Sequence, residues 1–354
     1  MAPPTSNNAA ILRVRHGQHQ IVTRATPSIL SDEVLIQITA TAINPVDWKL
    51  RDDFGDMLTY PAVLGSDAAG NIAAVGDEVT TLSVGDRVFF QGIIGNSDAS
   101  TFQQYCKMPA VLVGKTPSRI SDEQAGATSL SSMAAATALY SDTGFAIQPP
   151  WTEGGEQSGQ GKAIIILGGS SSVGQYAIQL ARISGFQRII TNSSKSHFAA
   201  LQRLGATEVL DRSSATPADY AAATHGLEAT HVLDAISIET TTLLAIDILQ
   251  QLKGGDVVTL LPKMQQPIKP PHPDPQRPVH TKRVVGLGSL PENRHISEPL
   301  MNALGGDDGW LAKGIFVPIN VEIVTGGLAA LEMALAKNKK GVSGVKIVIR
   351  PHEG

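Results

Sequence analysis

The feature that most constrains the fold is a continuous apolar run, Ala163–Leu167, that leads directly into the turn Gly168-Gly169-Ser170-Ser171-Ser172-Val173-Gly174. A short apolar run of this kind is typical of a strand buried on both faces of a parallel sheet. The small residues after it predict a tight turn into a helix. Strands and helices then alternate along the chain, which is the pattern of a doubly wound α/β domain.

The predicted elements of this domain follow one another at short spacing. The predicted strands are 163–167, 188–191, 208–210, 231–233, 256–261 and 282–288, and the predicted helices are 173–183, 197–204, 239–251 and 296–311. Seven prolines lie between residues 262 and 280. They exclude regular structure there, because proline donates no backbone hydrogen bond. We expect a long surface loop in this segment.

The chain before residue 125 has a different texture, with short β-type runs separated by Gly, Pro and Asp. Strands so close together favour an antiparallel barrel or sandwich. The predicted strands are 33–40, 71–75, 87–90 and 110–113, followed by helices at 124–130, with Asp122 as cap, and at 133–141. A last strand at 344–349 is expected to return to this domain. The predicted organisation is a β-rich domain of residues 1–125 plus 312–354 and an α/β domain of residues 126–311.

The composition of the chain narrows the class of protein. Hydrophobic residues make up 42% of the 354 residues, which excludes wholesale disorder. A net charge of −4 gives no electrostatic reason to expect nucleic acid or an anionic membrane as partner. The single cysteine, Cys106, excludes a disulfide framework and a Cys-rich zinc site. Neither a signal peptide nor a membrane-spanning run is evident, so a cytoplasmic protein is expected.

The turn after the 163–167 strand carries the strongest functional signal. Backbone N–H groups at a strand-to-helix turn, together with the positive end of the helix dipole, suit a pyrophosphate. In the pattern G-x-x-G-x-x-G the middle position holds Ser171, and a small residue there still permits close approach. No Gly-Lys-Ser/Thr follows, so the turn is not a P-loop. The turn predicts a dinucleotide site, and the alternative is an ordinary tight turn.

The residues after the second strand of this domain bear on which dinucleotide binds. An NAD site carries Asp or Glu about 20 residues beyond the glycine turn, where it binds the ribose 2′-hydroxyl. Here the chain reads Thr191-Asn192-Ser193-Ser194-Lys195-Ser196-His197, without an acid. Hydroxyl groups and a lysine suit a 2′-phosphate, which favours NADP(H). The alternative is a solvated polar loop.

The sequence offers no set of metal ligands. The closest histidine pair, His16 and His19, has no third ligand nearby, and a zinc site needs at least three. We therefore expect a metal-free protein that performs hydride chemistry on an already activated acceptor. The G-x-S-x-G motif of acyl-transfer hydrolases is also absent.

Several segments together resemble the medium-chain dehydrogenase/reductase superfamily, in its zinc-independent branch of quinone oxidoreductases and enoyl reductases. The matching segments are Ala42–Lys49, Tyr60–Gly70, Val84–Val88, the glycine turn and Leu204–Ala206. Zinc enzymes of the superfamily begin the first segment with Cys and carry Gly-His-Glu in the second, whereas this chain has Asn44 and Gly65-Ser66-Asp67. The resemblance implies a GroES-like β-rich catalytic domain and a Rossmann-type nucleotide-binding domain.

The chain most closely resembles the fungal toxin-cluster and trans-acting enoyl reductases that partner polyketide synthases. The shared features are the Asn-Pro-Val-Asp-Trp-Lys turn at 44–49, the Pro/Trp insertion before the 163–167 strand and the long insertion around 289–310. The resemblance implies NADPH as cofactor, with the 44–49 turn beside its nicotinamide. The implied cofactor-binding residues are Asn44, Val46, Asp47, Trp48, Lys49, Ser171, Ser172, Val173, Gly174, Ser193, Ser194, Lys195, Arg212, Leu260, Leu261, Val345 and Lys346. The implied walls of an acyl pocket are Met133, Ala135, Thr137, Leu139, Gly286, Leu287, Gly288 and Ser289.

The activity implied by the resemblance is reduction of α,β-unsaturated carbonyl compounds, in which hydride reaches the β-carbon and a proton reaches the α-carbon. Lys49 and Tyr60 are the candidate proton donors, with solvent as the default. The substrate is left open between a polyketide chain on a carrier protein, a free enal or enone, and a quinone. A second class also stays open: an interaction protein that binds NADPH without turnover.

The oligomeric state can also be addressed from the sequence. Simple quinone oxidoreductases of this superfamily dimerise by pairing the edge strands of their nucleotide-binding sheets. In this chain the stretch after Val284–Gly288 runs into Pro291 and charged residues, which disfavour the addition of a strand. We therefore expect a monomer.

Overall fold

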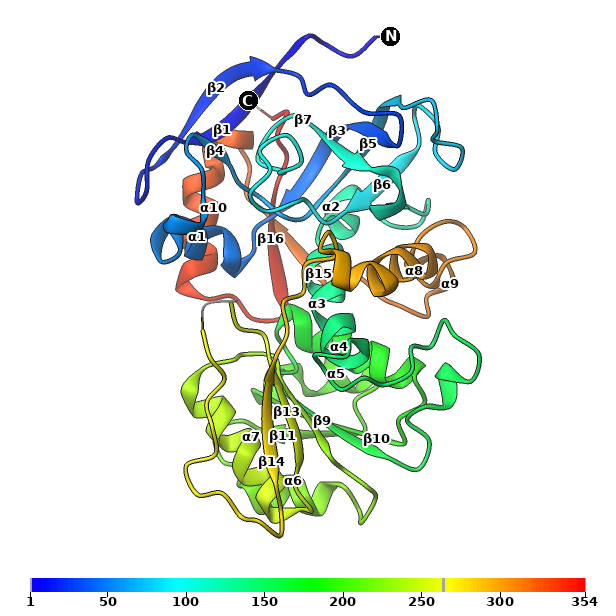
Figure 1. The fold of residues 1–354 in the computed structure, drawn as a ribbon, viewed down its shortest axis with the longest axis vertical. Helices are drawn as coiled ribbons and strands as arrows, with labels where there is room; N and C mark the ends of the chain where they lie inside the picture. The colour runs from blue at the N-terminus through cyan, green and yellow to red at the C-terminus, as the bar shows by residue number, and fades with distance from the viewer. Residues whose placement is uncertain (1, 263–264, 354) are drawn as a thin grey trace. The chain divides into compact units, whose positions relative to one another are not determined.

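The computed structural model of the protein describes residues 2–262 and 265–353 (Figure 1). The chain forms two compact units: the first holds residues up to Leu130 and from Ser297 onward, and the second is Ser131–Ile296. The chain passes between the units inside two helices, α3 (Ser129–Tyr140) and α8 (Arg294–Leu304). The boundaries expected from the sequence, after residues 125 and 311, differ from these because a helix that crosses a boundary shows no change of composition there.

The second unit is built on one parallel sheet of six strands in the order β11-β10-β9-β12-β13-β14. Its strands are β9 (Ala163–Leu167), β10 (Arg188–Ser193), β11 (Glu208–Asp211), β12 (His231–Asp234), β13 (Gly255–Thr259) and β14 (Val279–Arg283). Its helices are α4 (Ser172–Ile183), α5 (Phe198–Leu204), α6 (Pro217–Ala223) and α7 (Glu239–Gln251), with short 3-10 helices η3 (Gly155–Gln157), η4 (Lys195–His197) and η5 (Pro291–Asn293). The predicted doubly wound fold is confirmed.

The apolar run in β9 explains why this sheet is covered on both faces. Side chains alternate between the two faces of a strand, and all five residues of β9 are buried. Ile165 and Leu167 pack with Tyr220 of α6 and with Leu249 of α7 in one core cluster. Figure 1 shows α6 and α7 beside one another on the sheet. Residues of β9 that alternate with these face the other side, where α4 contacts β9 and β10.

Two predicted elements of this unit are placed differently in the structure. The last strand of the sheet is 279–283 rather than 282–288, because pairing of Gly255 with Val279 sets its start. The expected helix over 296–311 is divided into α8 and α9 (Trp310–Lys313), since Gly305, Gly306 and Gly309 lie between them. The described residues of the proline-rich segment up to Pro278 form no helix or strand, whereas the last two residues of the expected loop, Val279 and His280, begin β14.

The first unit contains a seven-stranded sheet and a three-stranded sheet. Its strands are β1 (Ser6–Leu12), β2 (His19–Ala25), β3 (Glu33–Ala42), β4 (Ala62–Val63), β5 (Ala68–Val75), β6 (Arg87–Phe90), β7 (Tyr105–Pro109), β8 (Val113–Lys115), β15 (Asn320–Ile323) and β16 (Val345–Ile349). Its helices are α1 (Pro45–Asp52), α2 (Asp122–Ala125) and α10 (Leu331–Lys340), with 3-10 helices η1 (Gly55–Met57), η2 (Ala110–Leu112) and η6 (Gly327–Ala330). All pairings except β15 with β16 are antiparallel.

The last strand of the chain joins this first unit. β16 pairs with β3, opposite Thr41 and Ala42, so the last strand returns to this part of the chain, as predicted. The strand expected at 110–113 is instead the 3-10 helix η2 followed by β8. The helix expected over 124–130 is the shorter α2, and its cap is Ser121, which accepts a hydrogen bond from the Gln124 N–H.

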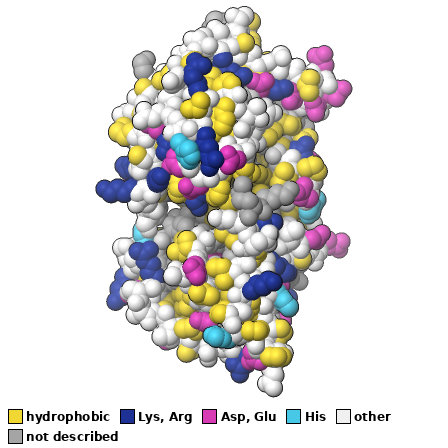
Figure 2. Space-filling view, turned by 60° about the vertical axis from the view of Figure 1, so that its left-hand side comes forward, with side chains coloured by type: hydrophobic (Ala, Val, Ile, Leu, Met, Phe, Trp, Pro, Cys, Tyr) yellow, Lys and Arg dark blue, Asp and Glu magenta, His cyan; other side chains and the backbone are white. Residues whose placement is uncertain are grey.

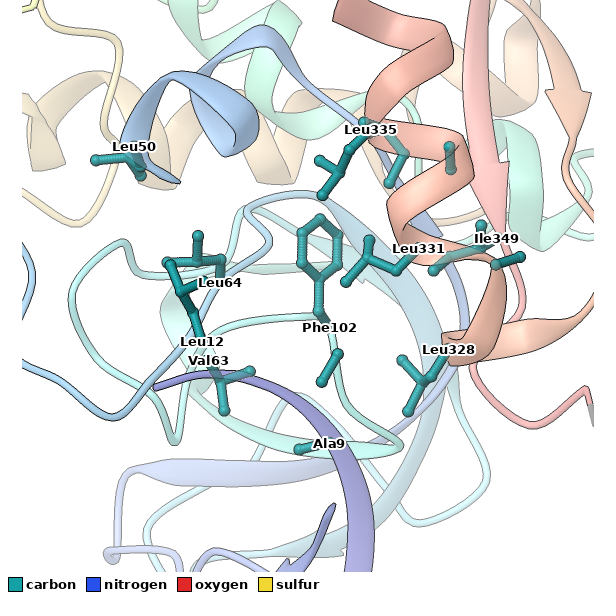
Figure 3. Close-up of a cluster of buried hydrophobic side chains, with 14 of the residues drawn as sticks. Ala9, Leu12, Leu50, Val63, Leu64, Phe102, Leu328, Leu331, Leu335 and Ile349 are labelled. Atoms are coloured by element: carbon teal, nitrogen blue, oxygen red, sulfur yellow. The ribbon is translucent and has the colours of Figure 1, made fainter. Parts of the chain in front are cut away.

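One core cluster of the first unit lies beneath α1 and α10 (Figure 3). Phe102 is completely buried at its centre, with Leu331 and Leu335 of α10 packed around it. Leu50 of α1 belongs to the same cluster. This packing fixes α1, whose first turn carries the predicted Asn44–Lys49 segment.

Two features concern nucleic acid and membranes as partners: the distribution of surface charge and the length of the apolar helices. On the face drawn in Figure 2, basic and acidic side chains are interspersed. In the part of the chain that the structure describes, no helix is long and apolar enough to cross a membrane.

Candidate nucleotide and catalytic sites

Three glycines, two in the turn between β9 and α4 and one in the first turn of α4, stand where a Cβ would meet neighbouring atoms. Gly168 has φ +78°, and a Cβ there would collide with the Ile236 side chain. A Cβ at Gly169 would collide with the Thr191 side chain, and one at Gly174 with the Gly168 carbonyl oxygen. The backbone is therefore packed closely against its neighbours at these positions, which leaves no room for a larger residue.

The first turn of α4 presents free backbone donors. Ser171 caps the helix, and its Oγ accepts a hydrogen bond of 3.0 Å from the Gly174 N–H. Within the described residues, the N–H groups of Ser172 and Val173 have no acceptor. Unpaired N–H groups at the positive end of a 12-residue helix form an anion site. The arrangement fits the pyrophosphate of a dinucleotide at the residues the sequence singled out.

The carboxyl ends of β10 and β11 bring three predicted residues together. Ser193 pairs with Asp211 across the two strands, and the Arg212 N–H donates to the Ser193 carbonyl oxygen at 3.0 Å. The Ser193 Oγ is buried and has no hydrogen-bond partner among the described residues. Lys195 is 81% exposed in its side chain, and Arg212 is also exposed. An unsatisfied hydroxyl beside two exposed cations fits a bound phosphate.

One acid lies closer to this group than the sequence suggested. Asp211, at the end of the neighbouring strand, has its Oδ2 3.6 Å from the Lys195 Nζ. Hydrogen bonds from the Ser213 hydroxyl and N–H, and the charge of Lys195, lower the pKa of Asp211. The carboxylate is therefore ionised at neutral pH and forms a surface ion pair with Lys195. Sequence reasoning missed this pair because it needs the register of β10 against β11.

Asn192 was also missed as a site residue. Its Oδ1 accepts a hydrogen bond of 2.7 Å from the Gly168 N–H, so the end of β10 is tied to the glycine turn. Residues 192 and 168 lie on different strand ends, and only the sheet order brings them together.

The ends of β12 and β13 complete this edge of the sheet. Asp234 is fully buried, and its Oδ2 accepts hydrogen bonds from the hydroxyl groups of Thr241 and Thr242 in α7. The Leu260 N–H donates to the Ser237 Oγ at 2.7 Å. Leu260 and Leu261 are half-buried directly after β13. The predicted cofactor contacts of these two leucines stay predictions.

The two predicted walls of the acyl pocket meet in the second unit. Gly286 lies against α3 so closely that a Cβ there would collide with the backbone of Ala134. Asn293 fixes the 286–289 stretch, since its Nδ2 donates to the carbonyl oxygens of Val285 and Leu287, each at 2.9 Å. The predicted α3 residues Met133, Ala135, Thr137 and Leu139 are buried, whereas Leu287 and Ser289 are half-buried.

The first turn of α1, in the first unit, holds a buried carboxyl group. Asp47 is 1% exposed, and its Oδ2 accepts a hydrogen bond of 2.7 Å from the Asn44 N–H. The Ser66 Oγ donates to its Oδ1 at 3.3 Å. Burial raises the pKa of Asp47 to about 7, although the Asn44 and Ser66 hydrogen bonds lower it. The predicted residues Asn44 and Asp47 thus cap the N-terminus of α1: Asn44 is the N-cap residue, and the Asp47 side chain accepts from its N–H.

A second buried acid lies near the first and carries its own cation. The Lys346 Nζ donates to the Asp67 Oδ2 and, at 3.2 Å, to the Ala127 carbonyl oxygen. Both side chains of this ion pair are almost completely buried. Burial raises the pKa of Asp67 even though the charge and hydrogen bond of Lys346 lower it. The side chain of Lys346, predicted to contact the cofactor, is therefore engaged with Asp67; the cofactor contacts of Lys346 and of its neighbour Val345 stay predictions.

The two candidate proton donors differ in their surroundings. Lys49 is half-buried, its Nζ lies 5.6 Å from the centre of the Trp48 ring, and it forms no ion pair with a described carboxylate. The Tyr60 hydroxyl donates to the Gly55 carbonyl oxygen at 3.1 Å. Burial raises the pKa of Tyr60, with Arg15 acting in the opposite direction. This bond agrees with a packing role for Tyr60.

Two further residues of the 44–49 turn are held by packing and hydrogen bonding. The Trp48 Nε1 donates to the Asn338 Oδ1 at 3.0 Å. Val46 packs against the core cluster shown in Figure 3.

No metal-ligand cluster is present among residues 2–262 and 265–353: nowhere there do three or more His, Cys, Asp or Glu side chains gather suitably. Where zinc enzymes of the superfamily carry Gly-His-Glu, this chain carries Ser66 and Asp67. The nearest cation to Asp67 is the ammonium group of Lys346.

Comparison with known proteins finds a family match in each of the two units. The family description "Alcohol dehydrogenase GroES-like domain" matches residues 30–122, and "Zinc-binding dehydrogenase" matches residues 172–299. The chain is 30% identical to the trans-enoyl reductase tndF of Aspergillus flavipes, over 97% of this chain and 98% of that protein. It is 31% identical to the trans-enoyl reductase himH of Aspergillus japonicus, over 90% of this chain and 89% of that protein.

A solved structure supports the same assignment. An alcohol dehydrogenase superfamily protein from Novosphingobium aromaticivorans matches with a TM-score of 0.77 and 26% identity, over 97% of this chain and 99% of that one. The fold, the glycine turn and the full-length similarity agree with one another, and the chain belongs to the medium-chain dehydrogenase/reductase superfamily of oxidoreductases.

Proposed function

We propose that the protein is an NADPH-dependent reductase of the activated C=C bond in α,β-unsaturated carbonyl compounds. The observation that carries this proposal is the similarity to trans-enoyl reductases over nearly the whole of both chains. Enzymes of the superfamily use NAD(P)H, which when bound supplies a hydride from its nicotinamide. The choice of NADPH over NADH is supported by the unsatisfied Ser193 hydroxyl and by the exposed cations of Lys195 and Arg212.

The residues of the second unit bind the two anionic parts of the cofactor. The N–H groups of Ser172 and Val173 bind the pyrophosphate at the start of α4. Ser193, Ser194 and Lys195 bind the 2′-phosphate. In the first unit, the turn Asn44–Lys49 is the part of the chain assigned to the nicotinamide end.

Lys49 is the better supported of the two proton donors. Its ammonium group has no carboxylate partner among the described residues and is held near Trp48, so it is available to a substrate oxygen or carbon. The Tyr60 hydroxyl is already bonded to the Gly55 carbonyl oxygen. A positive charge near the carbonyl oxygen of an enone stabilises the negative charge that develops there on reduction.

We further propose that the reaction needs no zinc. The carboxylate of Asp67 is neutralised by Lys346, and Asn44 stands where zinc enzymes of the superfamily carry Cys. Exhaustive chelation is expected to leave activity and Tm unchanged. Stoichiometric zinc that is lost together with activity would show this to be wrong.

The substrate class is tested with three acceptors: a 2-alkenoyl thioester, a free enone and a benzoquinone. The rate of NADPH oxidation is measured at steady state with each acceptor. We expect oxidation with the thioester or the enone and a slower rate with the quinone. Turnover of the quinone alone supports a quinone oxidoreductase. Saturable NADPH binding without oxidation by any acceptor supports the binding protein, and a polyketide synthase gene beside this one supports a synthase partner.

A further inference from the structure

We propose that Asn192 is a positioning residue that sets the glycine turn for the cofactor's pyrophosphate. The proposal rests on the proposed function and adds to it a residue that neither the motif nor the superfamily resemblance singled out. It concerns the second unit alone.

Asn192 binds two successive N–H groups of the turn. Its side-chain Oδ1 accepts from the Gly168 N–H at 2.7 Å, and its backbone oxygen accepts from the Gly169 N–H at 3.1 Å. The residue is 7% exposed, so water competes little for the side-chain bond. A bond between largely buried partners is stronger and more directional than one at the surface.

These two bonds decide which donors of the turn face a ligand. The N–H groups of Gly168 and Gly169 are directed at Asn192, whereas those of Ser172 and Val173, at the start of α4, have no acceptor among the described residues. Gly168 has φ +78° and lies close to the Ile236 side chain. The two bonds to Asn192 therefore hold the turn in place before any nucleotide binds, and a preformed site loses less binding energy to ordering.

The position of Asn192 in the chain also links the two anionic subsites. It directly precedes Ser193–Lys195, the segment assigned to the 2′-phosphate. The pyrophosphate is common to NADPH and NADH, whereas the 2′-phosphate belongs to NADPH alone. Loss of the Asn192 side chain should therefore weaken the binding of NADPH and NADH by the same factor. Loss of the Lys195 side chain should instead weaken the binding of NADPH alone.

The test compares Asn192→Ala with Asn192→Asp and with a matched control, Thr207→Ala. The control removes a side-chain acceptor from a backbone N–H, that of Ile189 at 2.9 Å, near the opposite end of β10. Asn192→Ala keeps the backbone bond to Gly169, so the fold is retained, which circular dichroism checks. The measurements are Kd for NADPH and for NADH and the hydrogen-exchange rate of the Gly168 amide.

Asn192→Ala is expected to raise both Kd values by about 3- to 10-fold, the loss of one hydrogen bond, and to speed exchange of the Gly168 amide. Asn192→Asp keeps an acceptor oxygen, so the Gly168 amide should exchange as slowly as in the wild type. Its added negative charge should still weaken the binding of both cofactors. Thr207→Ala should change neither Kd.

Three outcomes would overturn the proposal when the wild type binds both cofactors: a loss confined to NADPH, unchanged Kd values despite faster Gly168 exchange, or unchanged exchange in Asn192→Ala. A wild-type protein that binds neither cofactor would instead reject the proposed function, and this proposal with it. The two failures are thus distinguishable.

Discussion

At the scale of single residues, the buried groups Asp47, Asp67 and Lys346 of the first unit interact with one another and share one positive charge. Asp67 and Lys346 form an ion pair, and Asp47 lies nearby with no cation of its own. Burying a second unpaired carboxylate is costly unless it keeps its proton. This explains why the pKa of Asp47 is raised to about 7 by burial.

Asp47 therefore makes stability depend on pH. Its pKa in the folded protein lies above the ordinary value of 3.8, so the folded state holds a proton that the unfolded state has released. The free energy of unfolding should fall as the pH rises from about 4 to about 7, by roughly 1.4 kcal/mol for each unit by which the pKa is raised. Asp47→Asn removes this contribution, because an amide does not ionise and still accepts from the Asn44 N–H.

Urea unfolding of wild type and Asp47→Asn at several pH values between 4 and 8 measures the effect. The stability of the variant relative to wild type should rise with pH over this range. Curves that run parallel for the two proteins would mean that Asp47 is ionised throughout.

Lys195 carries the prediction on cofactor choice. Lys195→Ala should weaken NADPH binding by about 1–3 kcal/mol, as expected for a charge-assisted contact, and barely affect NADH. Lys253→Ala is a matched control, because Lys253 is exposed just before β13, at the opposite end of the strands. Titration of both cofactors decides the point, and equal losses for NADPH and NADH would reject the 2′-phosphate assignment.

At the scale of elements, α1 is held in place by charged groups from two other parts of the first unit. The Glu332 carboxylate of α10 accepts from the His19 N–H at 2.8 Å and bonds the His19 Nδ1 at 2.7 Å. Its other oxygen accepts from Arg51 of α1 at 2.6 Å. Burial raises the pKa of Glu332, but the His19 bonds and Arg51 outweigh it and lower the value.

Glu332→Ala should lower the free energy of unfolding by about 1–3 kcal/mol, because Arg51 and the almost fully buried His19 side chain lose their common acceptor. Glu78→Ala, at an exposed site in the same unit, should have an effect near zero. Urea denaturation measures both. Equal effects of the two substitutions would show that this network does not secure α1.

Elements with a strong local pattern could be predicted from the sequence, and those defined by pairing could not. Helix α7 was predicted with its observed bounds, Glu239–Gln251, because its apolar residues recur at helical spacing. The edge strand β14 was predicted three residues late, since its residues are mostly polar and its pairing with β13 sets its start. The sequence analysis does not predict helix α10, because the lysines of its last turn interrupt the apolar pattern.

The same distinction holds for the candidate site. The glycine turn and Ser193–Lys195 are contiguous segments, so their chemistry could be inferred directly. The Asp67–Lys346 pair joins residues 279 apart in the chain, and the Asn192–Gly168 bond depends on the order of the strands. Such contacts require the fold before they can be named.

At the scale of the whole molecule, β14 is the last strand at one edge of the second unit's sheet. The proline-rich segment is attached to this edge, because Arg283 of β14 donates to the Gln265 carbonyl oxygen at 2.8 Å. Lys282 of the same strand bonds Asp256 at 2.8 Å. Proline and charged side chains at an edge oppose the addition of another strand.

We therefore predict a monomer in solution. Light scattering at micromolar concentration should give a mass near 37.2 kDa. A species of twice that mass would show that the β14 edge is not protected.

The central claim, hydride transfer from NADPH to the β-carbon of an activated alkene, is tested most directly by isotope transfer. The protein is incubated with NADPH carrying deuterium at C4 of the nicotinamide and with a 2-alkenoyl thioester, and the saturated product is examined by mass spectrometry and NMR. One deuterium at the β-carbon, and none at the α-carbon, is the predicted result. Failure to reduce both the thioester and a free enone under conditions in which NADPH is bound, or a product without deuterium at the β-carbon, would contradict the account.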